Sequence, residues 1–191
     1  MLAEYKLTLP PQSPETAEGS AKAVLDKALK QVGFIPNMYA NMVHSPGVLN
    51  TYLDGYAAFR QDSGFTPAEQ EVVFLAISRE NGCEYCVGAH SLIADKFSGV
   101  PVEVTDAIRD GRPIPDARLR ALAEFTRTMV ASRGLPRRKD VDAFLAAGYT
   151  ERQILEIVLA IAVKTLSNYS NHLFHTQLDA KFAERRWTDP R

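Results

Sequence analysis

Cys83, Cys86 and His90 form the most reactive group of side chains in this chain. They are its only two cysteines, in a Cys-x-x-Cys pattern, and a histidine four residues after the second. On a helix, this spacing brings the two thiols within disulfide reach and places His90 one turn above Cys86. The cluster therefore fits a redox-active dithiol, part of a metal site, or two ordinary buried cysteines.

A cysteine thiol with a pKa of about 8.5 needs a helix N-terminus or a nearby base to ionise at neutral pH. Both are expected here, because the Cys-x-x-Cys pattern follows Gly82 at a predicted helix start and His90 can accept or relay the proton. If the helix before Gly82 folds back on the next one, Glu71 reaches the height of His90. Glu71 is then the candidate that orients this histidine, with Glu69 and Glu80 as alternatives on composition alone.

Charge and composition exclude several classes of partner. The chain has 191 residues, of which 46% are hydrophobic, and 22 basic against 23 acidic side chains give a net charge of -1. Nucleic acids and anionic membranes both select basic surfaces, so we expect neither as a partner. The N-terminus shows no signal-peptide pattern, and the longest strongly apolar stretch, 157–163, is too short to span a bilayer.

A cytoplasmic location is the expectation that follows from these absences. In a reducing cytosol, a Cys-x-x-Cys pair is catalytic, redox-sensing or metal-binding more often than it is a structural disulfide.

The apolar spacing predicts an all-α chain with no strand. We expect an extended, proline-rich arm over residues 1–17, a single helical domain over 18–184 and a polar tail over 185–191. Within the domain, Thr66-Pro67 starts a central helix, buried on every side, and Gly82 ends it. The last two helices are expected over 151–166 and from there to about 184.

An internal repeat of a helical hairpin is suggested by two matching segments. Gly64-Phe65-Thr66 aligns with Gly148-Tyr149-Thr150, so the Cys-x-x-Cys half, about 45–110, corresponds to a degenerate second half, about 115–184. The second half lacks the candidate reactive groups at the aligned positions, which are Leu155 for Glu71, Ser167 for Cys83, Ser170 for Cys86 and Phe174 for His90.

The spacing of Glu71, Cys83-x-x-Cys86 and His90 resembles the motif of the AhpD-like, carboxymuconolactone decarboxylase superfamily. The segments Gly33-Phe34-Ile35-Pro36-Asn37 and Ser45-Pro46 are similar to the front half of its peroxidase-related, alkylhydroperoxidase-like branch. The resemblance covers most of the chain, and it implies a compact all-helical fold that is commonly trimeric or hexameric.

The resemblance also implies an enzyme, a thiol-dependent hydroperoxide reductase. In that activity Cys86 would react with peroxide, Cys83 would be the resolving thiol, and Glu71 and His90 would form the proton relay. One position departs from the family pattern, because its hydroperoxidases have a histidine just before the second cysteine, where this chain has Tyr85. Tyrosine cannot supply an imidazole, and we expect Tyr85 to be a packing residue.

The expected partners are a small hydroperoxide, a dithiol protein or small thiol as reductant, and further copies of the chain. We expect no cofactor beyond the Cys83–Cys86 dithiol. Zinc is the alternative, since His172 or His175 offers a fourth ligand to the cluster. Polar contacts within the last helix or at a subunit interface are the more ordinary role for these histidines and for Asn168 and Asn171.

Two other functions fit the same sequence. One is a lyase acting on a small cyclic acid, for which the two cysteines would be dispensable, and the other is a non-enzymatic redox sensor.

Overall fold

The computed structural model describes residues 2–191, and within that range the chain is all-α, with no strand. The predicted fold class is therefore confirmed. The helices are α1 (Gly19–Val32), α2 (Asn37–Met42), α3 (Pro46–Asp62), α4 (Pro67–Glu80), α5 (Glu84–Phe97), α6 (Val102–Asp110), α7 (Ala117–Ala131), α8 (Arg138–Ala146), α9 (Glu151–Phe174) and a 3-10 helix, η1 (Ala180–Arg185). Within the described residues, no helix is both long and apolar enough to cross a membrane.

Residues 2–18, which include all of the expected arm except residue 1, contain no helix, and residue 1 lies outside the described part. The arm follows the end of α9 and then α2, where the amides of Leu7 and Gln12 donate to the carbonyls of Leu173 and Ala40, each at 2.9 Å. Prolines keep this segment extended, because each one removes a backbone donor and fixes φ.

The central helix is α4, as the sequence predicted. Thr66 caps its N-terminus in a capping box with Glu69, and Pro67 occupies the first helical position. Every residue from 69 to 78 is buried, because α4 packs against α5, α6, α7 and α9. Two charged residues of that buried stretch, Glu69 and Glu71, therefore need partners inside the protein.

A tight turn joins α4 to α5 and places the two cysteines. Gly82 adopts a left-handed conformation (φ +69°), which a residue with a Cβ rarely adopts, and the chain reverses there. Cys83 follows as the N-cap of α5, so Cys86 lies in the first turn of that helix. The predicted hairpin around Gly82 is thus present.

The second half does not repeat that hairpin. Thr150 and Gln153 form the same kind of capping box as Thr66 and Glu69, which supports the alignment at the helix start. However, α9 continues unbroken from Glu151 to Phe174, so the expected break near 166 was wrong. The physical reason is that the position aligned with Gly82 is Leu166, a good helix former, so nothing turns the chain.

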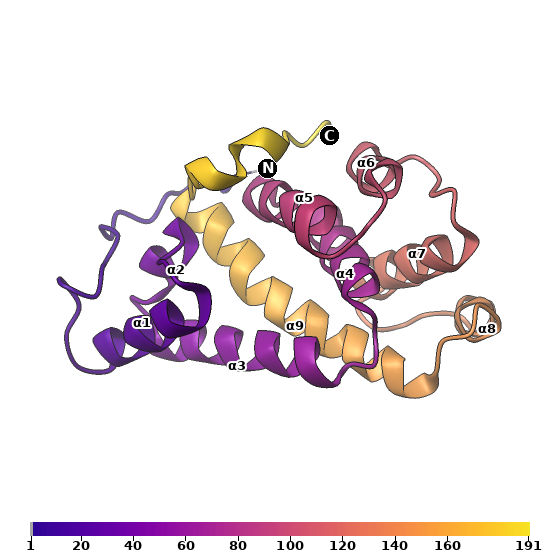
Figure 1. The fold of residues 1–191 in the computed structure, drawn as a ribbon, viewed down its shortest axis with the longest axis horizontal. Coiled ribbons are helices and arrows are strands. Elements are labelled where there is room, and N and C mark those ends of the chain that lie inside the picture. The colour runs from indigo at the N-terminus through magenta and orange to yellow at the C-terminus, as the bar shows by residue number, and fades with distance from the viewer. Residues whose placement is uncertain (1) are drawn as a thin grey trace.

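Figure 1 shows α9 crossing the molecule diagonally, with α3 along one side and the α4–α5 pair on the other. After His175 (φ +51°) the helix stops, and the chain runs through a short extended segment into η1. The last helix, which was expected to reach about 184, therefore does not form as one element: α9 ends at Phe174, and η1 follows separately. The last residues pack back on the domain, where Trp187 is buried and its Nε1 donates to the carbonyl of Arg109 at 3.2 Å.

The core has two parts, and the smaller one holds both cysteines. It lies between α1, α2, α3, α5 and α9, and its buried members include Leu25, Met38, Tyr39, Tyr52, Cys83, Tyr85, Cys86 and Val163. The larger part surrounds α4 and α7.

Candidate functional site

Both cysteines are free thiols in the interior, with only 1% of Cys83 and 2% of Cys86 exposed. Their position at the N-terminus of α5 exposes Cys86 to the unpaired N–H groups and positive dipole end of the helix. This position favours a thiolate at Cys86, as the sequence predicted for the pair.

Glu71 and His90 lie together, as the fold-back at Gly82 predicts. Glu71 Oε2 is 2.8 Å from His90 Nδ1, and both residues are buried. The other carboxylate oxygen of Glu71 accepts from Arg60 of α3, which also donates to the Tyr56 hydroxyl at 2.7 Å. Glu69 instead pairs with Arg118 and Glu80 with Arg127, so neither alternative carboxylate occupies this position.

Lys164 of α9 joins Glu71 and His90 in the site, although it was not among the predicted site residues. Its side chain is fully buried, and Nζ lies 2.9 Å from His90 Nε2. A signal for it existed, since Ile157, Ala160 and Lys164 follow one another at helical spacing on the buried face of α9. A lysine on such a face is rare enough to mark a candidate site.

The hydrogen bonds of His90 fix its tautomer. A carboxylate only accepts, so Nδ1 carries the proton and donates to Glu71. Nε2 of the neutral ring then accepts from Lys164. The pKa of His90 is lowered, because burial and the charge of Lys164 outweigh the opposing effect of Glu71. The ring is therefore neutral at pH 7.

The pKa of Glu71 is also lowered. Burial alone would raise it, but the hydrogen bonds and charges of His90 and Arg60 prevail. Glu71 therefore stays ionised inside the protein, paired on one side with Arg60 and on the other with His90.

The two thiols have opposite tendencies. Burial raises the pKa of Cys86, but the hydrogen bond from the Cys83 thiol and the charge of Lys164 bring it well below the ordinary value. Burial and the neighbouring Cys86 sulfur raise the pKa of Cys83 well above that value. The surroundings therefore favour ionisation of Cys86 over ionisation of Cys83.

Ser167 and Asn171, on the same face of α9 as Lys164, contact the sulfurs. Asn171 Nδ2 lies 3.4 Å from Cys86 Sγ and 3.8 Å from Cys83 Sγ, and Ser167 Oγ lies 3.9 Å from Cys86 Sγ. The second half of the chain therefore supplies polar groups to the site through Ser167 and Asn171, although neither was predicted to be a site residue. Asn168 and Asn171 are both buried within the chain.

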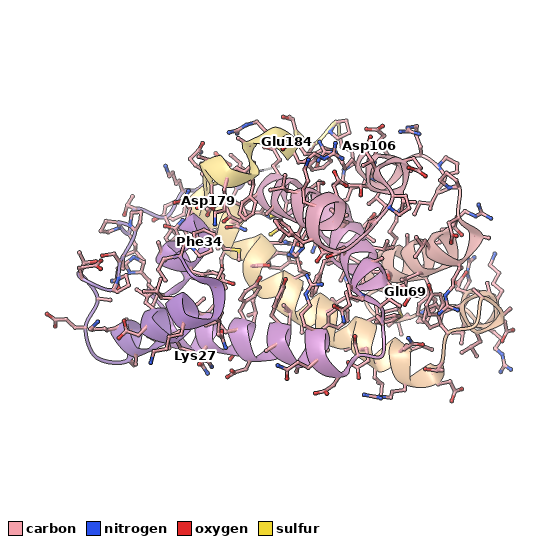
Figure 2. The ribbon with its side chains drawn as sticks, viewed as in Figure 1. Lys27, Phe34, Glu69, Asp106, Asp179 and Glu184 are labelled. Atoms are coloured by element: carbon pink, nitrogen blue, oxygen red, sulfur yellow. The ribbon has the colours of Figure 1, made fainter. Side chains whose placement is uncertain are left out.

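Tyr85 packs beside the cysteines, as expected, and its hydroxyl donates to Asp179 Oδ2 at 2.5 Å. Asp179 Oδ1 in turn accepts from the amide of Asn37, at the start of α2. Tyr85 thus ties the segment before η1 to the site. Figure 2 labels Asp179 at this end of the molecule.

A cavity of about 140 Å³ opens next to Cys86. Cys86, His90 and Lys164 are its reactive lining residues, while aromatic side chains form most of the remaining wall: Phe34, Tyr39, Tyr52, Tyr56, Tyr85 and Phe182. A protein cavity of about 150 Å³ accommodates benzene, so this one suits a small molecule. Cys83 lines a different cavity of about 80 Å³, together with Asn171, His172 and Trp187.

Among residues 2–191, no group of three or more histidine, cysteine or acidic side chains is arranged to hold a metal ion. His175 Nε2 lies 2.7 Å from the carbonyl oxygen of Ala3, so this histidine is directed at the N-terminal arm. The described residues therefore provide no ligand set for the zinc alternative.

Known proteins resemble this chain in sequence over one segment and in fold over most of its length. Residues 46–128 match the sequence profile of the carboxymuconolactone decarboxylase family, and that segment contains Glu71, Cys83, Cys86 and His90. The chain also shares its fold with an AhpD-core, peroxidase-related protein from Ralstonia eutropha JMP134 (TM-score 0.77, 24% identity, 91% of this chain and 93% of that one).

Residues 46–128 thus carry the sequence pattern of the carboxymuconolactone decarboxylase family, and the fold of the chain is AhpD-like. Two further structures are similar to this AhpD-like chain, and at these identities the similarity shows the fold. One is a peroxidase-related protein from Silicibacter sp. TM1040 (TM-score 0.73, 20% identity, 95% of each chain). The other is a variant of the debrominase Bmp8 in complex with 2,3,4-tribromopyrrole (TM-score 0.74, 17% identity, 94% of this chain and 96% of that one). No curated protein matches the AhpD-like chain by sequence.

Proposed function

We propose that this protein is a thiol-dependent hydroperoxide reductase in which Cys86 is the reacting thiolate. The observation that supports it most is the pairing of an electrostatically stabilised Cys86 with the free thiol of Cys83, next to a small cavity. A thiolate is the nucleophile that peroxide chemistry needs, and a second thiol converts the first oxidation product into a disulfide.

The reaction has two steps that balance. Cys86 thiolate attacks the outer oxygen of ROOH, the O–O bond breaks, and Cys86 sulfenic acid forms while RO⁻ leaves and takes a proton. Cys83 then attacks the sulfenic sulfur, which forms the disulfide and releases water. The sum is ROOH plus two thiols giving ROH, water and one disulfide.

Glu71 and His90 hold the proton network of this reaction. The carboxylate of Glu71 orients the ring through Nδ1, and the ring directs Nε2 toward Lys164 and the cavity. Glu71 thus orients His90, and His90 in turn orients Lys164, so that each group fixes the next one.

The substrate and the reductant follow from the surroundings of the two sulfurs. A cavity of about 140 Å³ with aromatic walls favours a small hydroperoxide with an apolar group. A dithiol protein or a small thiol is the proposed reductant, because a second thiol must return two electrons to the disulfide. Such a reductant places the reaction in a reducing compartment, for which the cytoplasm is our proposal.

We also propose that the protein forms homo-oligomers. Large apolar side chains are exposed along one side of α9, with exposed fractions of 70% for Leu155, 48% for Val158, 54% for Tyr169 and 40% for Leu173. An apolar stripe of this length on a single helix is typical of a surface that packs against a second copy.

A stoichiometric titration tests the enzymatic proposal. Reduced protein treated with one equivalent of a small hydroperoxide should lose two thiols and form one intramolecular disulfide. Protein lacking both cysteines (Cys83→Ser with Cys86→Ser) should not consume peroxide, and a parent protein that keeps both thiols would contradict the proposal. If the double variant instead keeps an activity on a lactone acid, the lyase function is favoured. A disulfide that forms without turnover favours a redox sensor.

Thiol-dependent dehalogenation is a second candidate, favoured by the aromatic walls of the cavity beside Cys86 and by the fold shared with a debrominase. In that reaction, R–X and two thiols give R–H, HX and a disulfide, so the electron balance is the same. Halide release from a small bromopyrrole under reducing conditions would support it, and no halide release would exclude it for that substrate.

A further inference from the structure

Lys164 is a buried lysine without a carboxylate partner. None of its surface is exposed, and its ammonium lies 5.5 Å from the centre of the Phe74 ring and 2.9 Å from His90 Nε2. Of the acidic residues in the range 2–191, none forms an ion pair with it. An uncompensated charge in the interior is strongly unfavourable, so Lys164 requires an anion.

The charges around the site identify that anion. Glu71 already pairs with Arg60 and accepts from His90, whose ring is neutral. The remaining group that ionises to an anion and lines the same cavity as Lys164 is Cys86. With Cys86 as a thiolate, Arg60 and Lys164 balance Glu71 and Cys86, and the buried cluster is neutral.

We propose that Lys164 is the counter-ion of the Cys86 thiolate and the acid that protonates the oxygen leaving from the substrate. The second half of this inference rests on the proposed hydroperoxide reductase function, and the first half does not. His90 is then a positioning residue, because its Nε2 is occupied by Lys164 and fixes the direction of the ammonium.

The proton balance of the cycle supports this role. In the reduced protein, Cys86 is a thiolate and Lys164 is an ammonium. This ion pair has the same number of protons as a neutral thiol beside a neutral amine. When the thiolate attacks ROOH, the leaving RO⁻ takes a proton from Lys164 and departs as ROH. Cys83 thiol then closes the disulfide with loss of water, and Lys164 is left as a neutral amine. Reduction by two external thiols restores the thiolate and the ammonium together.

No other charged or titratable group near Cys86 is placed for the same role. The tyrosines around the cavity are neutral at pH 7, His90 is neutral, and Arg60 is held by Glu71. The titratable groups that line the cavity with Cys86 or interact with it are Tyr39 of α2, Tyr52 and Tyr56 of α3, Cys83, Tyr85 and His90 at and within α5, and Lys164 and His172 of α9. Behind them, Arg60 of α3 contacts Tyr56, and Glu71 of α4 contacts His90.

The test measures Cys86 ionisation without peroxide. In a Cys83→Ser background, where Cys86 is the single thiol, the rate of alkylation by iodoacetamide is followed against pH. Lys164→Met and Lys164→Gln should move the midpoint upward by at least one pH unit, which lowers the rate by roughly tenfold or more at any pH below both midpoints. Lys96→Met, which removes an exposed lysine from α5, should leave the profile unchanged.

The two variants separate charge from hydrogen bonding and guard against misfolding. Cys86 can take up a proton when Lys164 is absent, so Lys164→Met leaves no unpaired buried charge and should fold. Lys164→Gln keeps a donor toward His90 but removes the charge, and it provides the test if the methionine variant does not fold. An unchanged midpoint in the folded variants overturns the counter-ion assignment.

A second measurement tests the acid. At a pH where Cys86 is fully ionised in both proteins, the Cys83→Ser protein with Lys164→Met should still react with hydroperoxide at least tenfold more slowly than with Lys164 intact, while alkylation rates are equal. Equal peroxide rates overturn the acid role. If protein with Lys164 intact does not react with peroxide at all, the proposed function fails, and the alkylation profile still decides the counter-ion role.

Discussion

Glu71 Oε2 lies 2.8 Å from His90 Nδ1, although the two residues are 19 positions apart and belong to different helices. The turn at Gly82 brings them together, and Arg60 of α3 and Lys164 of α9 approach them from two further helices. The site is therefore a meeting point of four helices, and its chemistry depends on their packing as much as on the Cys-x-x-Cys pattern.

Removing the Glu71 carboxylate should destabilise the fold. Glu71→Ala leaves Arg60 without its buried partner and His90 without an acceptor, so we expect a loss of about 3–5 kcal/mol in the free energy of unfolding. Denaturant titration measures this change. The control is Glu124→Ala on the exposed side of α7, which should stay within about 0.5 kcal/mol of the parent. Equal losses in both variants would contradict the buried network.

The same network makes stability depend on pH. Because folding lowers the pKa of Glu71 below 4.5, its contribution is fully present above pH 4.5 and is lost as the pH falls through the folded value. His90, whose pKa is lowered from 6.5, acts in the same direction, because the unfolded state binds its proton more readily. Unfolding should therefore become easier as the pH falls below about 6.5, and more steeply below about 4.5. In Glu71→Gln the loss below pH 4.5 should be smaller, and an identical profile would refute the assignment.

The sequence predicted the elements well where local signals are strong. Thr66, Pro67 and Gly82 define α4 and the turn that follows it, and the Glu71–His90 contact follows from that hairpin. Lys164, Ser167 and Asn171 were not placed in the site, because their role depends on how α9 packs against α5, which no local pattern encodes. The break expected within α9 was wrong. Leu166 stands at the position aligned with Gly82, and without that glycine the helix continues through the serines that align with the two cysteines.

Cavity size should set substrate preference. Ala89 is buried and lines the cavity beside Cys86, so Ala89→Leu fills part of about 140 Å³. The variant should keep its rate with hydrogen peroxide and lose roughly tenfold or more with a bulky aromatic hydroperoxide, since an overfilled site costs about 1–3 kcal/mol. Hydrogen peroxide is the internal control. An equal fall in rate with both peroxides would show that the substitution disturbs the thiols and does not act through the volume of the cavity.

Reduction of the disulfide should begin at Cys83. The sulfur with the lower thiol pKa is the better leaving group, so an incoming thiolate attacks Cys83 and releases Cys86. Cys83 also lines a different cavity from the one beside Cys86. Oxidised protein treated with a small monothiol and quenched in acid should carry the mixed disulfide on Cys83 in peptide mapping. A mixed disulfide mainly on Cys86 would contradict this order.

The exposed apolar stripe of α9 should hold copies of the chain together. Val158→Arg places a charge in that stripe and should lower the molar mass in light scattering to that of one chain, 21.1 kDa. Glu151→Arg, at the exposed start of the same helix, should leave the assembly intact. A parent protein that is already monomeric would rule out the assembly.

The most direct test of the central claim, that Cys86 is the thiolate that reacts with peroxide, is trapping of sulfenic acid in the two single-cysteine variants. Each is reduced, treated with one equivalent of a small hydroperoxide in the presence of dimedone, and analysed by mass spectrometry. Cys83→Ser should acquire a dimedone adduct on Cys86 at a rate that exceeds ordinary thiol oxidation, and Cys86→Ser should acquire almost none on Cys83. An adduct that forms faster on Cys83, or at the same slow rate on both, would contradict the account.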